Sequence, residues 1–307
     1  MIFRGNFSHF FGETMLPALH HIIKEEWGAV PEQWSQRFRV ETSDRDIEQT
    51  SSLFGLGLFR QIDEGDIITY DNPGQGYKKT FTHTRYGLGV KITQDTVEDN
   101  KFGLIERNVR ALARSQKETL EIDMASTING GFTVTQTPDG VYLFSASHPV
   151  PKKPGSVQSN LATGAQQLSV TSLELAMTAY ETMVDDTGLQ INLPMPDVVV
   201  APKNRWNVTE ILKSPMRSDT ANNTTNAFRQ AGNGGLPGYM VWRYLTNADD
   251  WFLMAPPAQT ELICFWRRKP YTKGSVDDDT EVAKTMRRYR KSHGAAHYLG
   301  TYGVKGA

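Results

Sequence analysis

The chain has 307 residues, 38% hydrophobic and 22% charged, which is enough to bury a sizeable core and is unlike a disordered protein. Its 33 Lys and Arg nearly balance 34 Asp and Glu, and the net charge of -1 argues against a dedicated nucleic-acid-binding protein. The single cysteine, Cys264, cannot form an intrachain disulfide. Neither a secretory signal nor an apolar run of about 18 residues is present, so we expect no export and no membrane span.

The first 92 residues predict a helix followed by strands. Apolar residues from Met15 to Trp27 recur at helical spacing and mark one helix in an N-terminal arm. Between 46 and 92, β-favouring runs at 53–59, 67–70 and 77–92 surround an Asp-Asn-Pro-Gly turn at 71–74, which is typical of long strands in a hairpin-like excursion. Because both the arm and the excursion are too sparsely apolar for a core of their own, we expect them to bury their apolar residues on neighbouring subunits.

We expect the 71–76 turn to be the tip of this excursion, far from the core of its own chain.

The next segment predicts a long helix. Apolar residues recur every three or four positions from Gly103 to Ile128, and a glycine pair at 130–131 ends the pattern. About 26 helical residues span roughly 39 Å, which is long for a globular protein. One stripe should be buried: Ile105, Val109, Leu112, Gln116, Leu120, Met124 and Ile128.

The second half of the chain alternates helices and strands after a loop-rich connection at 132–168. A helix capped by Ser169 or Thr171 should run until Gly188, with Glu174 placed to complete a capping box. A strand at 197–201 and a helix at 204–213 follow. The 219–238 segment is rich in Asn, Thr and Gly and predicts a surface loop. Further strands are predicted at 239–245, 251–255, 262–266, 282–290 and 295–302, which gives an α+β protein.

Catalytic and metal-binding patterns are weak. His293 and His297 share one face at i and i+4, but no acidic residue completes a metal-binding motif. Ser145 and His148 lack the glycine-flanked elbow of a serine nucleophile. No glycine cluster has the spacing of a phosphate or dinucleotide loop. Cys264 lies in an apolar strand, as a buried inert thiol would. We therefore expect no catalytic residue, no metal and no cofactor.

Two basic runs, 267–269 and 287–291, lie on predicted strands joined by an acidic turn at 277–279. Strand alternation places Arg288 and Arg290 on one face of their strand, and Arg287, Tyr289 and Lys291 on the other. Ion pairs between subunits are the favoured interpretation. Contact with packaged DNA and a solvated face remain alternatives, since packaging needs only weak, sequence-independent phosphate contacts.

Four segments give the sequence a resemblance to a known family: LFSASHP at 143–149, LSVTSLELAM at 168–177, PDVVVAPKNRW at 196–206 and the run from Trp266 to Tyr298. Over most of residues 45–307 the chain resembles the major capsid proteins of tailed bacteriophages, of the Hong Kong 97 type, and in particular Mu-like prophage head subunits. The resemblance implies five parts: an N-terminal arm at 1–45, an E-loop at 46–92, a P-domain with its spine helix at 93–164, an A-domain at 165–260, and C-terminal strands at 261–307 that return to the P-domain.

The implied function is structural: hexamers and pentamers of the chain would form an icosahedral shell around double-stranded DNA, which is bound without sequence specificity. The implied partners are a portal protein and a possible decoration protein, and no contact with a membrane is implied. The chain would assemble in the host bacterial cytoplasm and end in the capsid shell of the virion. Because the N-terminus lacks a long charged helical segment, a separate scaffold protein is expected. The 219–238 loop is expected near the capsomer centre. The predicted subunit-interface residues are Asp71, Asn72, Pro73, Gly74, Lys78, Lys79, Arg287, Arg288, Arg290, Asn222 and Asn223.

Two other functions compete with this interpretation. A soluble oligomeric enzyme would use a cleft near the 130–165 loop. A DNA-binding module is disfavoured by the neutral net charge and by the absence of a recognition motif. Only the capsid hypothesis predicts shells, tubes or ring-shaped capsomers from the purified chain.

Overall fold

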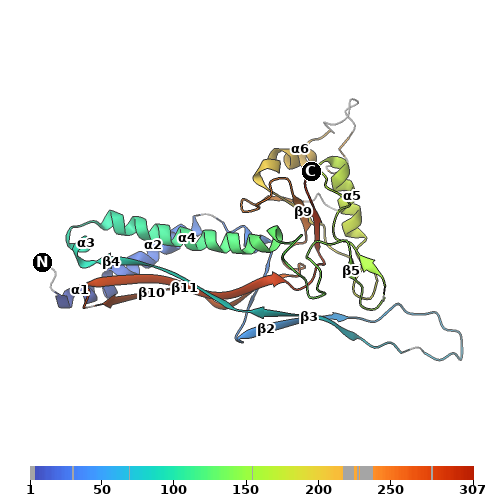
Figure 1. Ribbon diagram of the computed structural model, residues 1–307, viewed down its shortest axis with the longest axis horizontal. Helices are drawn as coiled ribbons and strands as arrows, with labels where there is room; N and C mark the ends of the chain where they lie inside the picture. The colour runs from blue at the N-terminus through green and yellow to red at the C-terminus, as the bar shows by residue number, and fades with distance from the viewer. Residues whose placement is uncertain are drawn as a thin grey trace.

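The structure is a computed structural model of the whole chain, elongated in outline (Figure 1). A long helix runs beside a long β-hairpin, a second sheet with two helices stands at one end, and a thin two-stranded ribbon projects beyond it. The residues described are 4–29, 31–68, 70–153, 155–216, 225–226, 228, 238–277 and 279–307. Within these ranges, no helix is long and apolar enough to span a membrane.

The first sheet has the strand order β1-β10-β11-β4. β10 and β11 form a long antiparallel hairpin whose register runs from Leu262 opposite Ala295 to Asp277 opposite Val282. β4 pairs antiparallel with β11, and the short β1 pairs parallel with β10. The strands are β1 (Arg39–Thr42), β4 (Thr84–Thr93), β10 (Leu262–Asp277) and β11 (Val282–Ala295).

Helix α4 (Phe102–Asn129) lies along this sheet and confirms the predicted spine. Every residue of the predicted stripe is buried, and Gly130 caps the helix end as its sequence indicates. Glu121 fixes the helix to two other segments, because its carboxylate accepts hydrogen bonds from the Gln33 backbone N–H at 2.6 Å and from the Trp242 indole N–H at 3.1 Å. A short helix, α3 (Gln94–Glu98), leads into α4 from β4.

The N-terminal segment is more helical than predicted and packs on its own chain. It runs from α1 (Arg4–Phe10) through one π-helical turn, η1 (Phe11–Met15), into α2 (Leu16–Gly28), and a 3-10 turn, η2 (Trp34–Gln36), follows. The expectation that this arm would bury its apolar residues on a neighbour is wrong. Its apolar face is buried against α4 and the first sheet, in a cluster that contains Phe7, Phe11, Met15, Leu19, Ile23, Ile105, Val109 and Ala283.

Gly274 on β10 allows this close packing. A Cβ atom there would lie 2.7 Å from Cδ1 of Leu16 and 3.0 Å from Cε1 of Phe11, so a larger residue would push the N-terminal helices off the sheet. On the α4 side, Arg114 binds Glu26 at 2.5 Å and the Lys117 ammonium donates to the Trp27 carbonyl at 2.9 Å.

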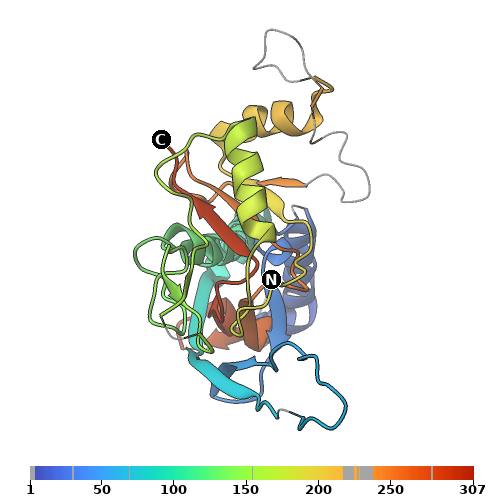
Figure 2. The ribbon, with the colours of Figure 1, turned by 90° about the vertical axis from the view of Figure 1, so that its right-hand side faces the viewer.

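The second sheet has the order β12-β9-β7-β8, with α5 and α6 packed on it (Figure 2). Among the described strands of this sheet, β7 and β8 are the one parallel pair. The expectation that the strands of 261–307 return to the P-domain does not hold for β12, which pairs with β9 in this second sheet and not with the sheet beside α4. The elements are α5 (Val170–Glu181), α6 (Arg205–Lys213), β7 (Asp197–Val200), β8 (Tyr239–Val241), β9 (Trp251–Met254) and β12 (Thr301–Val304), with a 3-10 turn, η3 (Pro202–Asn204), before α6.

The helix α5 is capped by Ser169, as predicted, but the capping box is completed by Ser172 and not by Glu174. The helix ends at Glu181, several residues before Gly188, because the chain turns back there and the Ile191 backbone N–H donates to the Met183 carbonyl at 3.1 Å. The 130–168 connection is mostly irregular and contains one small antiparallel pair, β5 (His148–Pro149) with β6 (Val157–Gln158).

The projecting ribbon consists of β2 (Ile47–Phe54) and β3 (Gly74–Thr82), paired antiparallel. The predicted strand arrangement around the 71–74 turn is wrong. Residues 55–73 form the connection between the two strands, and no strand covers 67, 68 or 70. Gly74 is the first residue of β3 and pairs with Phe54 at the far end of the ribbon. The predicted strand at 77–92 is divided at His83 into β3 and β4, which belong to different sheets.

Candidate assembly surfaces

The ribbon leaves the body at His83, which joins β3 to β4. The His83 side chain is buried between two hydroxyl groups, with Nε2 3.1 Å from Ser43 Oγ and Nδ1 2.9 Å from Ser292 Oγ. Arg290 of β11 closes the same junction, because its guanidinium binds Asp46 at 2.6 Å just before β2 begins. The ribbon is therefore fixed at its base by interactions with β11, and its direction is set by the first sheet.

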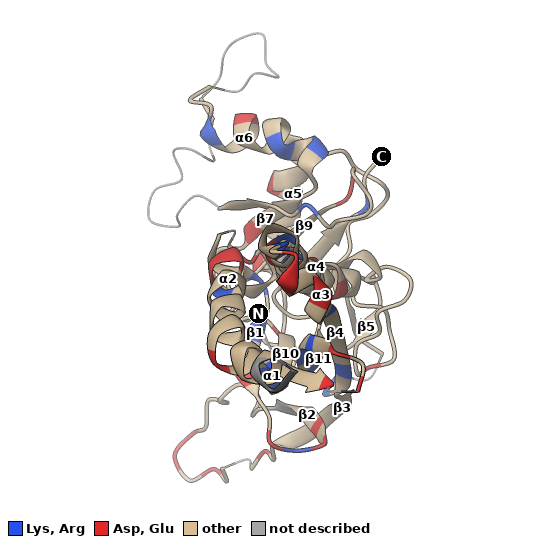
Figure 3. Ribbon diagram, turned by 90° about the vertical axis from the view of Figure 1, so that its left-hand side faces the viewer, with Lys and Arg blue, Asp and Glu red and all other residues tan. Residues whose placement is uncertain are grey.

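The far end of the ribbon is a loop of residues 55–73, here called the projecting loop. It extends beyond the rest of the molecule, on the side opposite α1 (Figure 1). Many of its side chains are apolar yet exposed. Phe59 is fully exposed, and about half or more of the side chain is exposed in six others: Leu56, Leu58, Ile62, Ile67, Ile68 and Tyr70. A monomer rarely presents so many apolar side chains together, and such a patch marks an interaction site. Acidic residues outnumber basic ones along it (Figure 3).

The root of the projecting loop contacts its own chain, contrary to the expectation that 71–76 is a distant tip. The Asp71 carboxylate binds the Lys152 ammonium at 2.5 Å and accepts the Gly57 backbone N–H at 2.8 Å. The hydrogen bond from Lys152 lowers the pKa of Asp71. Lys152 also donates to the Gly55 carbonyl at 3.2 Å. Asn72, Pro73 and Gly74 therefore lie where the loop re-enters the ribbon.

The two lysines of β3 differ in their surroundings. Lys79 donates to the Gln136 carbonyl at 2.5 Å, and burial lowers the pKa of its ammonium group. Lys78 pairs in register with Ser51 of β2. Lys79 thus holds the ribbon against the irregular connection of the same chain.

The basic run of β11 divides between faces as the alternation predicts. Arg287, Tyr289 and Lys291 face α4: Arg287 binds the Gln116 side chain and Lys291 binds Asp123. Arg288 and Arg290 point to the opposite face. There, Arg288 stands among Arg85, Lys91 and Lys284 along a shallow groove that follows Gly87 and Gly89.

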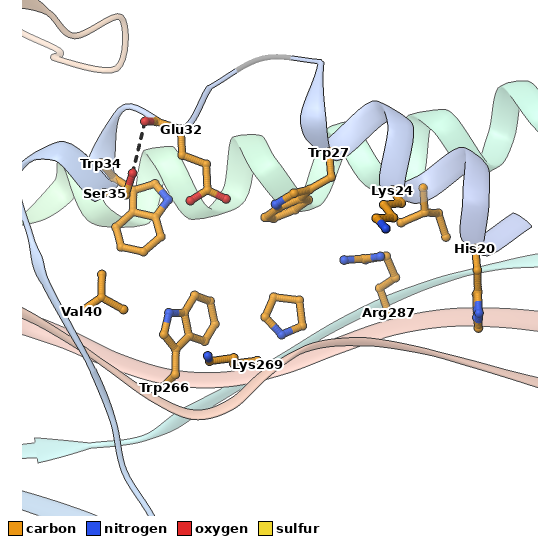
Figure 4. Close-up of a pocket in the computed structure, with 12 residues that line it drawn as sticks. His20, Lys24, Trp27, Glu32, Trp34, Ser35, Val40, Trp266, Lys269 and Arg287 are labelled. Atoms are coloured by element: carbon orange, nitrogen blue, oxygen red, sulfur yellow. Dashed lines mark hydrogen bonds between the residues drawn. The ribbon is translucent and has the colours of Figure 1, made fainter.

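Three tryptophans from separate segments line a pocket of about 530 Å³ between α2, η2 and β10, here called the tryptophan pocket (Figure 4). Trp34 and Trp266 meet edge to face at 6.3 Å between ring centroids, and the Arg287 guanidinium lies 5.5 Å from the Trp27 ring centroid. Burial lowers the pKa of Arg287. Glu32 directs its carboxylate into the pocket (Figure 4), and burial together with the Glu121 charge raises the pKa of this carboxyl. The sequence reasoning missed this site, because no spacing pattern connects the three tryptophans.

A family model described as phage capsid protein matches residues 76–302, well over half of the chain. The chain belongs to that family. No curated protein matches this capsid protein.

Solved structures share its fold at low sequence identity. The capsid of Ralstonia phage GP4 is 13% identical with a TM-score of 0.54, covering 89% of this chain and 88% of that one. The "capsid of native GTA particle computed with C5 symmetry" is 10% identical with a TM-score of 0.55, covering 91% and 92%. A virus-like particle from Pyrococcus furiosus is 7% identical with a TM-score of 0.54, covering 94% and 98%. The α+β fold is therefore that of the tailed-phage capsids, whereas the finer resemblance to Mu-like head subunits stays a prediction.

The loop-rich connection of this capsid protein encloses a buried polar cluster. His148 is fully buried, its Nδ1 lies 2.6 Å from an Asp139 oxygen, and its ring stacks on Tyr298 at 3.9 Å. Burial opposes ionisation of Asp139, but hydrogen bonds from His148 and Thr137 outweigh it and lower the pKa of this carboxyl. The pocket beside the cluster holds about 10 Å³, room for at most one water.

The remaining chemical candidates lie apart from one another. His293 contacts Lys291 and Asp123 beneath α4, whereas His297 lies 3.1 Å from Asp186 near the ribbon. Among the described residues, no group of three metal-ligating side chains converges on one point. Cys264 is buried, and burial raises the pKa of its thiol to about 12. Asn222, Asn223 and most of the 219–238 segment lie outside the described residues, so that predicted surface stays a prediction.

Proposed function

We propose that many copies of this capsid protein associate into hexamers and pentamers that close an icosahedral shell around double-stranded DNA. The projecting loop carries the proposal, because its apolar side chains have no cover within the described part of their own chain. Copies arranged side by side would cover them, and the combined contacts of one subunit can exceed a standard interface of roughly 1,600 Å². The five-fold symmetry named for the GTA particle capsid is consistent with pentamers.

The arrangement of the elements supports a division of the shell subunit into parts. We assign residues 1–45 to the N-terminal arm, 46–92 to the E-loop, 93–164 to the P-domain and 165–260 to the A-domain. Of the C-terminal residues, β10 and β11 join the P-domain, whereas β12 joins the A-domain sheet. In this assignment the arm is held on its own subunit, so the E-loop makes the main apolar contact between copies.

The packaged DNA would meet a face with spare positive charge. The groove around Arg85, Lys91 and Arg288 lies on the face of the first sheet away from α4, where glycines leave the backbone accessible. Contacts there would be to phosphates and independent of sequence. The scaffold, portal and decoration proteins and assembly in the host cytoplasm stay predictions.

The test is assembly of the purified chain, followed by sedimentation and negative-stain microscopy. We expect shells, tubes or ring-shaped capsomers from the wild type and almost none from Leu58→Ser/Phe59→Ser. Val134→Ser is the matched control, because Val134 is similarly exposed but lies outside the loop. A wild-type chain that remains monomeric at all concentrations would contradict the proposal.

A further inference from the structure

The tryptophan pocket combines aromatic walls with positive charge. Its volume of about 530 Å³ lies within the range of about 300–1,000 Å³ that small-ligand sites span. Indole rings form the walls, and three permanent cations lie beside them: Lys24, Lys269 and Arg287 (Figure 4). The single carboxylate among the lining residues belongs to Glu32. The pocket therefore suits a ligand that has an aromatic body and a negative charge.

The pocket contains a buried hydrogen-bond donor without an acceptor. The Trp34 side chain is only 3% exposed, and its indole N–H donates to none of the described residues. Figure 4 shows this nitrogen facing the interior of the pocket. Buried polar groups in proteins normally have partners, so a ligand atom that accepts a hydrogen bond would complete the site.

The cations of the pocket differ in their freedom to bind an anion. Lys24 and Lys269 are exposed and take part in none of the ion pairs among the described residues. Arg287 is held in place, because its guanidinium binds the Gln116 side chain and lies 5.5 Å from the centroid of the Trp27 ring. The two lysines can thus close on an anion, while Arg287 supplies a fixed positive charge at the wall.

Glu32 sets a requirement for the edge of the ligand. Burial and the Glu121 charge raise the pKa of its carboxyl, which accepts hydrogen bonds when ionised and can also donate one when protonated. A ring whose edge carries both donors and acceptors would satisfy Glu32 and the Trp34 indole together. A nucleobase has such an edge and its phosphate carries negative charge, and proteins commonly hold unpaired bases by stacking them on aromatic side chains.

We propose that the tryptophan pocket binds a nucleotide, with the base among the three indole rings and the phosphate at Lys24 and Lys269. The Trp34 indole N–H then donates to a ring nitrogen or carbonyl of the base, and Glu32 contacts the same edge. The ligand is a free nucleotide or an unpaired base of a nucleic-acid strand, since both present these groups. The site is separate from the groove around Arg85, which lies on the opposite face of the sheet, and it does not depend on the shell function.

The direct test is isothermal titration calorimetry of the purified chain with the four deoxynucleoside monophosphates at one fixed salt concentration. We expect saturable binding of at least one of them and none of inorganic phosphate, which lacks the base. Lys269→Glu should weaken this binding by about tenfold, because it places a negative charge beside the phosphate. Lys91→Glu makes the same charge change on the far face of the sheet and should leave the affinity near wild type. Absence of binding by all four, or an equal loss in both variants, would overturn the site.

Trp34→Phe tests the indole donor separately, because it keeps an aromatic ring and removes the N–H. The free chain loses no hydrogen bond in this variant, so circular dichroism should show it folded, and we expect several-fold weaker nucleotide binding. Unchanged affinity in the folded variant would overturn the placement of the base. Lys269 is exposed, so the charge-reversal pair still decides the question if Trp34→Phe does not fold.

Competition distinguishes the two sources of the nucleotide. A single-stranded oligonucleotide and its duplex are each added to the chain saturated with the monophosphate that binds most tightly. Displacement by the single strand alone assigns the pocket to unpaired bases, because bases in a duplex are stacked and out of reach, and displacement by neither assigns it to a free nucleotide. Equal displacement by the duplex would overturn the site. None of these outcomes requires assembly, so a chain that binds nucleotide and forms no particles would contradict the shell function alone.

Discussion

The N-terminal helices and the projecting loop are both rich in apolar residues, and both were expected to bury them on neighbouring subunits. In the structure the two regions differ in burial. The helices bury Phe7, Phe11 and Leu19 against α4 and the first sheet of the same chain, whereas the loop leaves Phe59 and Ile67 in solvent. The helical segment therefore stabilises the single chain, and the loop is available for contacts between chains.

The difference arises from spacing and not from composition. From Phe7 to Ile23, buried residues recur every four positions, so one face of a helix can pack on the sheet. In the loop, glycines at 55, 57 and 65 interrupt the apolar residues, and no regular element gathers them on one face. Apolar content alone thus predicts that a segment will be buried. The spacing of its apolar residues predicts whether it can be buried in its own chain.

The largest expected effect contrasts one phenylalanine from each region. Phe11→Ala should lower the free energy of unfolding of the unassembled chain by about 3–5 kcal/mol, because a fully buried ring is removed. Phe59→Ala should change it by less than about 0.5 kcal/mol, since the ring is fully exposed there. Urea unfolding followed by circular dichroism measures both. Equal losses in the two variants would erase the distinction between the regions.

The spine helix gives the next effect. Leu112→Ala and Leu120→Ala should each cost about 2–5 kcal/mol, because both side chains are buried beneath the helix and leave cavities. Leu104→Ala is the control on the exposed side of α4 and should cost far less. Thermal melting of the three variants measures the effect, and wild-type stability in the two buried-site variants would show that α4 does not hold the body together.

The pH dependence of stability should reside in the body and not in the loop. Burial, assisted by the Lys291 charge, lowers the pKa of His293 to about 4. An unfolded histidine has a pKa near 6.5, so between these values the unfolded chain binds a proton that the folded chain does not, and stability falls as the pH drops. The loss should reach about 3 kcal/mol at pH 4.

His293→Gln removes this titration and should flatten the stability curve between pH 6.5 and 4, the window set by the lowered pKa. Denaturant unfolding at several pH values tests it. Parallel curves for wild type and variant would refute the assignment to His293, whatever the absolute stability of the variant.

The smallest effect concerns the root of the loop. Lys152→Met removes the ion pair with Asp71, which is solvent-exposed, so global stability should barely change. Hydrogen exchange should nevertheless accelerate at the Gly57 amide, whose acceptor is the Asp71 carboxylate. Unchanged exchange at Gly57 would mean that the loop root is held by other contacts.

The sequence predicted the elements governed by local patterns. The α4 stripe and the Ser169 cap follow from spacing and from capping chemistry, and both are confirmed. The 71–74 turn was misplaced, because turn-forming residues can also end a long loop, and Lys152, which holds Asp71, is distant in sequence. The pairing of β12 with β9 is likewise a long-range choice.

The candidate assembly surfaces were likewise predictable only where a local pattern governs them. The alternation of Arg287 and Arg288 on β11 could be predicted, because side chains in a strand alternate. The tryptophan pocket could not, because Trp27, Trp34 and Trp266 meet only after α2 has packed beside α4 and β10. The sequence could predict an extended excursion between 46 and 92, but it could not predict where the tip of that excursion lies.

Replacing residues 55–73 by a two-residue Asn-Gly turn tests most directly the claim that the projecting loop serves contacts between chains. Phe54 and Gly74 are opposite one another in the ribbon, so such a turn can close it. Circular dichroism melting and negative-stain microscopy are performed on the same preparation. We predict a wild-type melting curve without shells, tubes or capsomers. Normal particles from the shortened chain would contradict the account.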